Sequence, residues 1–179
     1  ESVRSALEHV QEDASHVIVH DAARPCVSPR LIRDLLTAAE TCQAVTPGVP
    51  VVDTLKRVEA SASTVAAAEE DVLADSILGD AGKAIVATRK VIETVDRENV
   101  MGIQTPQCFS IDLLRRAYAS SDLTGVTDDA MVIERLGESV HVIPGDAANM
   151  KVTTPADLVM IRRLMGLKGD PARPAHKRF

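Results

Sequence analysis

The chain has 179 residues, of which 45% are hydrophobic and 26% charged, and a formal net charge of −6, a balance typical of one globular domain. Only 2% of the residues are aromatic and tryptophan is absent, which argues against a nucleic-acid surface built on base stacking. No apolar run approaches the roughly 20 residues of a membrane span, and no signal segment opens the chain. We expect a soluble cytoplasmic protein without membrane or nucleic-acid partners, whose cysteines (Cys26, Cys42 and Cys108) are reduced thiols.

In the first third of the chain, helical and extended patterns alternate. An apolar helical face at residues 3–10 is followed by the β-branched run 16–19, which is typical of a central strand in a parallel sheet. The next helix has clear start signals, because Ser28 is a good N-cap and Pro29 suits the first helical position, and its apolar face runs to Ala39. Two more strands are predicted, at 44–52, which ends in a proline-rich irregular loop, and at 53–59.

Residues 60–90 differ from the rest of the chain, because Ala, Ser, Glu and Asp dominate there. We predict a surface excursion with at most one short helix. Beyond it, Ser110, Thr127 and Thr154 are predicted N-caps of three helices, and Gly137 closes the second of them. Short strands are predicted at 92–95, 100–103 and 140–143, and a loose tail at 166–179.

Alternation of strands with helices predicts the fold class, a three-layer α/β domain with a mostly parallel sheet over residues 1–165. Its most informative segment is His20-Asp21-Ala22-Ala23-Arg24-Pro25, which directly follows the strand at 16–19. Open α/β sheets bind their ligands where strands end in loops. We therefore expect Asp21 and Arg24 to lie at a site, with an internal ion pair as the structural alternative.

Four other polar segments could carry chemistry, and each also has an ordinary structural explanation. Residues 53–57 could be an edge strand, Asp96-Arg97 solvated charges, residues 104–107 a turn, and Lys151 a surface charge. Taken together, they supply guanidinium, ammonium and hydroxyl donors together with carboxylates. This combination suits phosphate groups accompanied by a hard cation.

The same segments, in the same order, make the chain resemble the 2-C-methyl-D-erythritol 4-phosphate cytidylyltransferase family of non-mevalonate isoprenoid biosynthesis. The resemblance covers nearly the whole chain except residues 60–90 and the tail. The ribitol-5-phosphate cytidylyltransferases share most of the pattern, but Ala23 and the run Thr127-Asp128-Asp129-Ala130 look more like the methylerythritol enzymes. The matching segments are 20–25, 53–56, 95–97, 104–107, 127–130 and 149–158.

The resemblance implies a Rossmann-like nucleotidyltransferase fold that transfers CMP from CTP to a polyol phosphate and releases pyrophosphate, with Mg²⁺ as cofactor. It also implies a homodimer with a shared active site, because in this family an arm, here at about 47–108, crosses into the partner subunit. It assigns catalytic roles to Asp21, Arg97 and Lys151, with Asp21 also at the metal. Further assignments are substrate contacts at Arg24, Thr54, Thr105 and Thr127, and nucleotide contacts at Ser2, Asp21 and Ala22.

The chain departs from the family pattern in two places. The Gly-rich strand-to-helix turn that closes on phosphates in the family has no counterpart in residues 1–179, so we expect these residues alone to be catalytically incomplete. Residues 60–90 also make the arm longer than usual. Two alternatives stay open: a non-catalytic dimeric module that binds a sugar phosphate, and a domain fused to a further enzyme.

Overall fold

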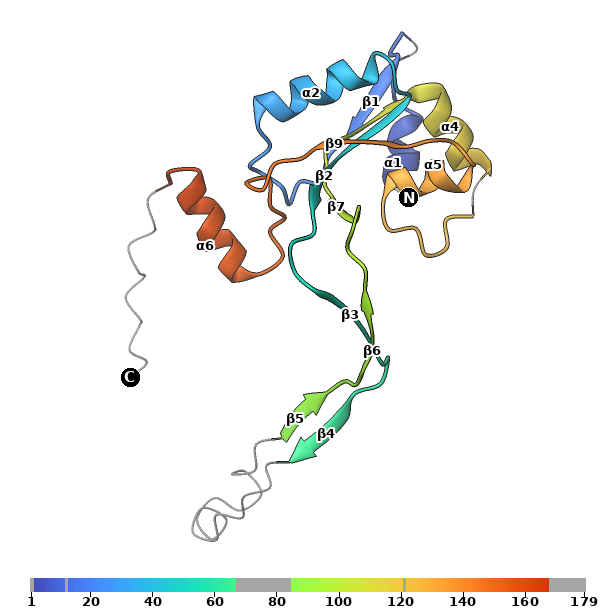
Figure 1. The fold of residues 1–179 in the computed structure, drawn as a ribbon. Coiled ribbons are helices and arrows are strands. Elements are labelled where there is room, and N and C mark those ends of the chain that lie inside the picture. The colour runs from blue at the N-terminus through green and yellow to red at the C-terminus, as the bar shows by residue number, and fades with distance from the viewer. Residues whose placement is uncertain (1, 12, 67–84, 121, 168–179) are drawn as a thin grey trace, which may run out of the picture. The chain divides into compact units, whose positions relative to one another are not determined.

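The computed structural model describes residues 2–11, 13–66, 85–120 and 122–167 of the chain. These residues form two compact units (Figure 1). The first unit contains the residues up to Pro50 and from Met101 onward, and the second contains Val51–Val100. No helix in the described part of the chain is long and apolar enough to cross a membrane.

The first unit is built on a five-stranded sheet. Strand β8 (Gln107–Ser110) lies between β1 (His16–Val19) and β2 (Ala44–Pro50) and is antiparallel to both. Strand β7 (Met101–Ile103) is also antiparallel to β2, whereas β9 (His141–Pro144) pairs with β2 in parallel. The α/β class is as predicted, but among the described pairings only β2 with β9 is parallel.

The prediction of a mostly parallel sheet with residues 16–19 at its centre is therefore wrong for the described strands. Within those strands β1 pairs with β8 alone, and Ile18 is exposed. Strand β7, the next strand of this sheet along the chain after β2, runs antiparallel to β2, and so does β8. The β-branched run correctly indicated a strand, but such a run does not encode the direction of its neighbour.

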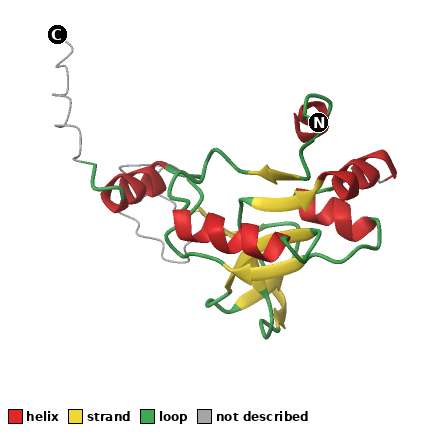
Figure 2. Ribbon diagram, turned by 90° about the horizontal axis from the view of Figure 1, so that it is seen from above, coloured by secondary structure: helices red, strands yellow, loops and turns green. Residues whose placement is uncertain are grey.

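Helices cover both faces of this sheet, and neighbouring strand residues divide between two cores because their side chains point to opposite faces. Val45 and Cys108 pack against α2 (Pro29–Ala39) through Leu35 and Ala39. Ala44 and Phe109 pack on the other face against α4 (Ile111–Ser120) and α5 (Asp129–Arg135), together with Leu7 of α1 (Ser2–Leu7). In Figure 1 α2 lies apart from α1, α4 and α5, and Figure 2 shows the same fold from above, with helices in red and strands in yellow. This is the predicted three-layer arrangement.

The helix starts follow the cap signals with one correction. The Ser28 hydroxyl accepts from Leu31 N at 3.2 Å, and the Ser110 hydroxyl accepts from Leu113 N at 3.3 Å, as predicted. The N-cap of α5 is Asp128, whose carboxylate accepts from Met131 N at 3.0 Å, and not Thr127. A carboxylate is a strong N-cap and interacts favourably with the positive end of the helix dipole. Asp128 therefore caps the helix in place of the preceding threonine.

The second unit contains two antiparallel ladders. Strand β3 (Leu55–Val58) pairs with β6 (Val91–Val95), and β4 (Ser63–Ala66) pairs with β5 (Ile85–Thr88). The first ladder matches the predicted strands at 53–59 and 92–95. The second ladder adds regular strands to the surface excursion predicted at 60–90, and β-branched residues, which favour strands, occur in both of them. The short helix predicted in that segment falls outside the described residues.

Replacing Leu35 by Ala should destabilise the first unit, because Leu35 is fully buried between α2 and β2. We expect the free energy of unfolding to fall by about 2–5 kcal/mol. Leu36→Ala is the matched control, because the neighbouring Leu36 is 47% exposed and its truncation should cost less than about 0.5 kcal/mol. Urea unfolding followed by circular dichroism measures both; equal losses would contradict the assigned core.

Helix α6 (Pro155–Leu164) should lose stability in acid through Asp157. Its carboxylate accepts from Thr153 N, Thr153 Oγ1 and Thr154 N at 2.8–2.9 Å, which lowers the pKa of Asp157 to about 2. A lowered folded-state pKa means that the contribution is complete above about pH 4 and is lost as the pH falls toward 2. The stability difference between wild type and Asp157→Asn, measured by urea unfolding from pH 5 to 2, should shrink with falling pH.

Candidate active site

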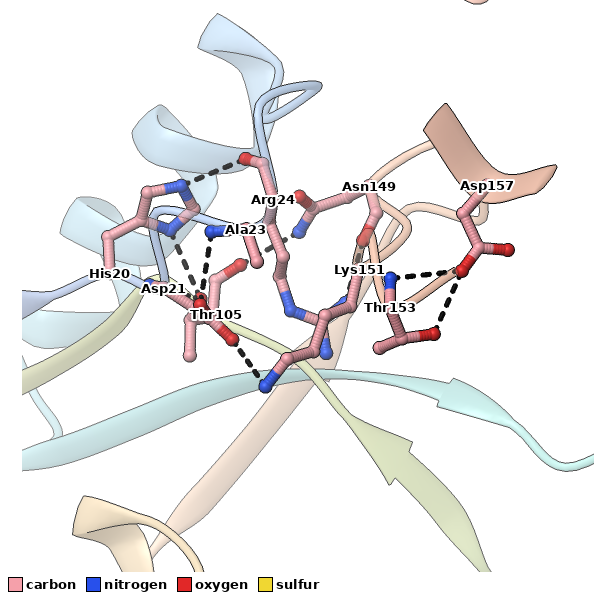
Figure 3. A network of polar contacts seen from close by, with 9 residues as sticks. All are labelled: His20, Asp21, Ala23, Arg24, Thr105, Asn149, Lys151, Thr153 and Asp157. Atoms are coloured by element: carbon pink, nitrogen blue, oxygen red, sulfur yellow. Dashed lines mark hydrogen bonds and ion pairs between the residues drawn. The ribbon is translucent and has the colours of Figure 1, made fainter. Parts of the chain in front are cut away.

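The loop after β1 is folded back on itself and fixes Asp21. The Asp21 carboxylate accepts from Ala23 N at 3.1 Å, and the Asp21 carbonyl accepts from Arg24 N at 2.9 Å. His20 Nε2 donates to the Arg24 carbonyl at 3.0 Å. These bonds fold the segment into a tight turn, whose Asp21 and Arg24 side chains face the segment that carries Asn149 and Lys151 (Figure 3).

Asp21 forms an ion pair with Lys151, whose ammonium lies 2.7 Å from Asp21 Oδ2. The hydrogen bond from Lys151 lowers the pKa of the Asp21 carboxyl, and the Ala23 N–H lowers it further. The side chains are 28% and 51% exposed, so solvent screens the pair and leaves the ammonium accessible to a ligand. The carboxylate and the ammonium come from loops after two different strands, β1 and β9.

Thr105 joins this pair from the turn between β7 and β8. Its hydroxyl accepts from Asp21 N at 2.9 Å and lies 3.1 Å from His20 Nδ1. Because β8 is antiparallel to β1, with Gln107 opposite Val19, the turn before β8 falls beside the loop after β1. The register of one ladder therefore brings Thr105 to Asp21.

Backbone and side-chain bonds tie the loop after β9 to the loop after β1. Arg24 Nη1 donates to the Asn149 carbonyl at 2.8 Å, and Val152 N donates to the Ala23 carbonyl at 2.8 Å. Asn149 Nδ2 donates to the Thr105 carbonyl at 2.8 Å. Lys151 lies between the two tied positions, which explains why its ammonium reaches Asp21 (Figure 3).

The structure thus brings together four of the predicted residues, Asp21, Arg24, Thr105 and Lys151. Ala22 lies in the same loop and is exposed. Thr127 lies outside this network, exposed just before α5, with its hydroxyl 3.7 Å from Met131 Sδ. Ser2 begins α1 and is exposed.

Two of the predicted site residues, Arg97 and Thr54, belong to the second unit. Arg97 is exposed and donates from Nη1 to the Val52 carbonyl, so this bond joins the first and last segments of that unit. Thr54 is exposed in the segment before β3. The neighbouring Asp96 carboxylate accepts from Glu98 N at 2.9 Å, so the turn that carries Arg97 is ordered by its own carboxylate.

Sequence reasoning assigned no role to two buried polar residues of this network, Gln104 and Asn149, which are 6% and 0% exposed. Both lie in segments that were singled out, beside Thr105 and Lys151. From the sequence alone, amides at such positions are taken for exposed loop residues, because their burial depends on contacts that are distant in sequence. Their adjacency to residues with assigned roles was the one available signal.

The carboxylates of the described residues do not make a metal centre. No cluster of three or more His, Cys, Asp or Glu side chains able to hold a metal ion occurs among them. Both Asp21 oxygens already accept hydrogen bonds, one from Ala23 N and one from the Lys151 ammonium. A single carboxylate paired with a cation does not fit a resident divalent ion, which takes several oxygen ligands.

Comparison with known proteins places this geometry in a family. The family model described as IspD, 2-C-methyl-D-erythritol 4-phosphate cytidylyltransferase, matches residues 1–77 and 62–166. The chain is 40% identical over 177 residues to the enzyme of that name from Frankia casuarinae, covering 98% of this chain and 55% of the relative. It is 38% identical over 162 residues to the one from Bacillus cereus, covering 89% and 59%.

The crystal structure of 2-C-methyl-D-erythritol 4-phosphate cytidylyltransferase from Thermus thermophilus is also similar, with a TM-score of 0.69 and 33% identity. The alignment covers 93% of this chain and 68% of that one. The chain therefore has the Rossmann-like α/β fold of nucleotidyltransferases. It belongs to the IspD family of 2-C-methyl-D-erythritol 4-phosphate cytidylyltransferases. It spans less than two thirds of the length of the two curated relatives named above.

Replacing Lys151 by Met should raise the pKa of the Asp21 carboxyl toward its ordinary value, because the hydrogen bond from Lys151 is the largest cause of its lowering. The pair stabilises the fold at neutral pH, and this contribution is lost as the pH falls through the folded-state pKa of Asp21. Carbon-13 NMR titration of the carboxyl resonance measures the shift. Arg33→Met, which removes an exposed cation of α2, should leave it unchanged.

Proposed function

We propose that the protein is a cytidylyltransferase that transfers CMP from CTP to 2-C-methyl-D-erythritol 4-phosphate. The observation that supports this most directly is the Asp21–Lys151 pair beside Arg24 and Thr105. Together these residues offer two cations and a hydroxyl at the loops after β1, β7 and β9. Membership of the IspD family supports this chemistry. The proposal extends to the setting of the reaction, isoprenoid biosynthesis in a bacterial cytoplasm.

In the proposed reaction, a phosphate oxygen of the polyol phosphate attacks the α-phosphorus of CTP. A new P–O bond forms, the bond to the β-phosphate oxygen breaks, and pyrophosphate leaves with that electron pair. Positioning and charge stabilisation supply most of the catalysis in such transfers. Lys151 would leave Asp21 in part to hold the attacking phosphate, with Arg24 and the Thr105 hydroxyl as neighbouring donors.

Residues outside this cluster would complete the site. We assign Arg97 to the incoming phosphate, and Thr54 and Thr127 to phosphate or polyol contacts. We assign Ser2 and Ala22 to the nucleotide side. In this proposal the chain acts as a homodimer, and the second unit of one subunit supplies Arg97 and Thr54 to the site of its partner. Mg²⁺ would arrive with CTP, bound mainly by its phosphate oxygens, because the described residues form no cage for it.

A pyrophosphate-release assay tests the proposal with the complete gene product that contains this chain. We expect release from CTP and Mg²⁺ only when 2-C-methyl-D-erythritol 4-phosphate is present. Lys151→Ala should reduce kcat/KM by about a hundredfold or more, because one developing charge loses its partner. Arg33→Ala, the exposed control on α2, should leave the rate near that of wild type.

Three outcomes would contradict the proposal. Release with ribitol 5-phosphate in place of the methylerythritol substrate would assign the related enzyme. Binding of the polyol phosphate without turnover would identify a binding module. Equal rates for Lys151→Ala and wild type would remove Lys151 from the site.

A further inference from the structure

We propose that the buried side-chain amides of Gln104 and Asn149 form a clamp that positions Lys151 for the reaction. Neither residue carries charge or is exposed to a ligand, so both act through Lys151. The kinetic part of this inference depends on the proposed function, whereas the structural part does not.

The side chain of Gln104 hydrogen-bonds to the main chain of the loop after β9. Its Nε2 donates to the Asp146 carbonyl at 2.9 Å, and its Oε1 accepts from Asp146 N at 3.2 Å. One side-chain amide thus pairs both polar groups of a single residue, as a neighbouring strand would. The fit at this point is close, because a Cβ added to Gly145 would lie 2.7 Å from Gln104 Oε1 and 3.0 Å from the Gly48 carbonyl.

Asn149 connects the same loop to Thr105. Its Nδ2 donates to the Thr105 carbonyl at 2.8 Å and lies 3.5 Å from Gln104 Oε1. Its main-chain N–H donates to the Asp146 carbonyl at 2.9 Å, and its own carbonyl accepts from Arg24 Nη1. Asn149 precedes Lys151 by two residues, so these bonds fix the backbone position from which the Lys151 side chain extends.

The clamp is attached to the middle of the sheet. Gln104 N donates to the Pro47 carbonyl at 2.8 Å, and the Thr46 hydroxyl donates to the Gln104 carbonyl at 3.2 Å. Pro47 and Thr46 are buried residues of β2, the strand that pairs with β7, β8 and β9. The position of the Asp146–Lys151 loop is thereby fixed relative to β2, the strand that pairs with three other described strands of this sheet.

Lys151 needs such support because the contacts of its own side chain do not fix its position. Its side chain is half exposed, and the segment from Gly145 to Thr154 contains no helix or strand. A long ammonium side chain held by one screened ion pair has many conformations to lose. Fixing its backbone lowers that cost, which is the usual role of residues that support a reacting group.

The first residue of β8 offers a matched control. Gln107 is as buried as Gln104 and also pairs two polar groups, but its partners are the Asp128 carboxylate and Ala130 N at the start of α5. Gln107→Met therefore removes an equivalent buried amide without touching the loop that carries Lys151. Gln104→Met keeps the length of the side chain and removes both of its bonds to Asp146.

The first readout is the pKa of the Asp21 carboxyl, measured by carbon-13 NMR on the complete gene product, since it reports the approach of Lys151 in the absence of any substrate. In Gln104→Met and Asn149→Leu, which add no charge, we expect it to rise toward its value in Lys151→Met, and in Gln107→Met to stay at the wild-type value. An unchanged value in both clamp variants would overturn the inference. If Gln104→Met does not fold, Asn149→Leu decides alone, because it removes the bond from Asn149 Nδ2 to the Thr105 carbonyl and adds no charge.

The second readout is steady-state kinetics. Gln104→Met should lower kcat by about ten- to hundredfold, as expected for a misplaced reacting group, while KM for CTP changes little. Equal kcat losses in Gln104→Met and Gln107→Met would overturn a specific role for the clamp and indicate general loosening of the turn. An inactive wild type would count against the proposed function alone, and the Asp21 titration would still decide the clamp.

Discussion

The Asp21–Lys151 contact is the interaction on which the site depends, yet it cannot be what holds the site together. Both side chains are partly exposed, and ion pairs in such positions contribute about 1 kcal/mol or less. The loop after β9 is held to the loop after β1 by hydrogen bonds to main-chain carbonyls, one donated by Val152 N and one by the charged Arg24 Nη1. The ion pair is therefore a product of the surrounding geometry. A weak, screened contact suits a binding site, because an incoming phosphate can compete with the Asp21 carboxylate for the ammonium.

The sheet explains why three separate loops converge there. Strand β9 follows β2 in parallel, whereas β8 runs antiparallel between β1 and β2, so the turn before β8 meets the loop after β1 at one end of the sheet. A wholly parallel sheet would have placed the start of β8 at the opposite end, away from Asp21. The antiparallel strand that contradicts the sequence-based expectation is thus the element that delivers Thr105 to the site. Departures from a regular layout are expected where function imposes a geometry of its own.

What the sequence predicts correctly here is local. Helix starts at Ser28 and Thr154 depend on one side chain and a backbone N–H three residues later, so their signals lie within a single turn. Strand β8 escaped notice because its first residue, Gln107, is polar although nearly fully buried, and its burial is compensated by Asp128 and Ala130, which lie far along the chain. Charged residues of the site could be singled out because open α/β sheets bind their ligands in the loops at strand ends. The clamp could not, since a buried amide is recognised only through partners that the sequence does not place.

Polar burial at this site also carries a cost that the rest of the described structure avoids. Within the described residues, the buried side-chain atoms without a hydrogen-bond partner are Arg24 Nε and Asn149 Oδ1, and both belong to the network that joins the loops after β1 and β9. An unpaired buried polar atom costs about 1–3 kcal/mol, so a chain selected for stability alone would place apolar residues here. Arg24 and Asn149 instead hold one another through Nη1 and a carbonyl, and keep a cation next to Lys151 in a protein of net charge −6. The structure thus gives up some stability to keep positive charge and hydrogen-bond donors together at the loops after β1 and β9, where the proposed anionic substrate would bind.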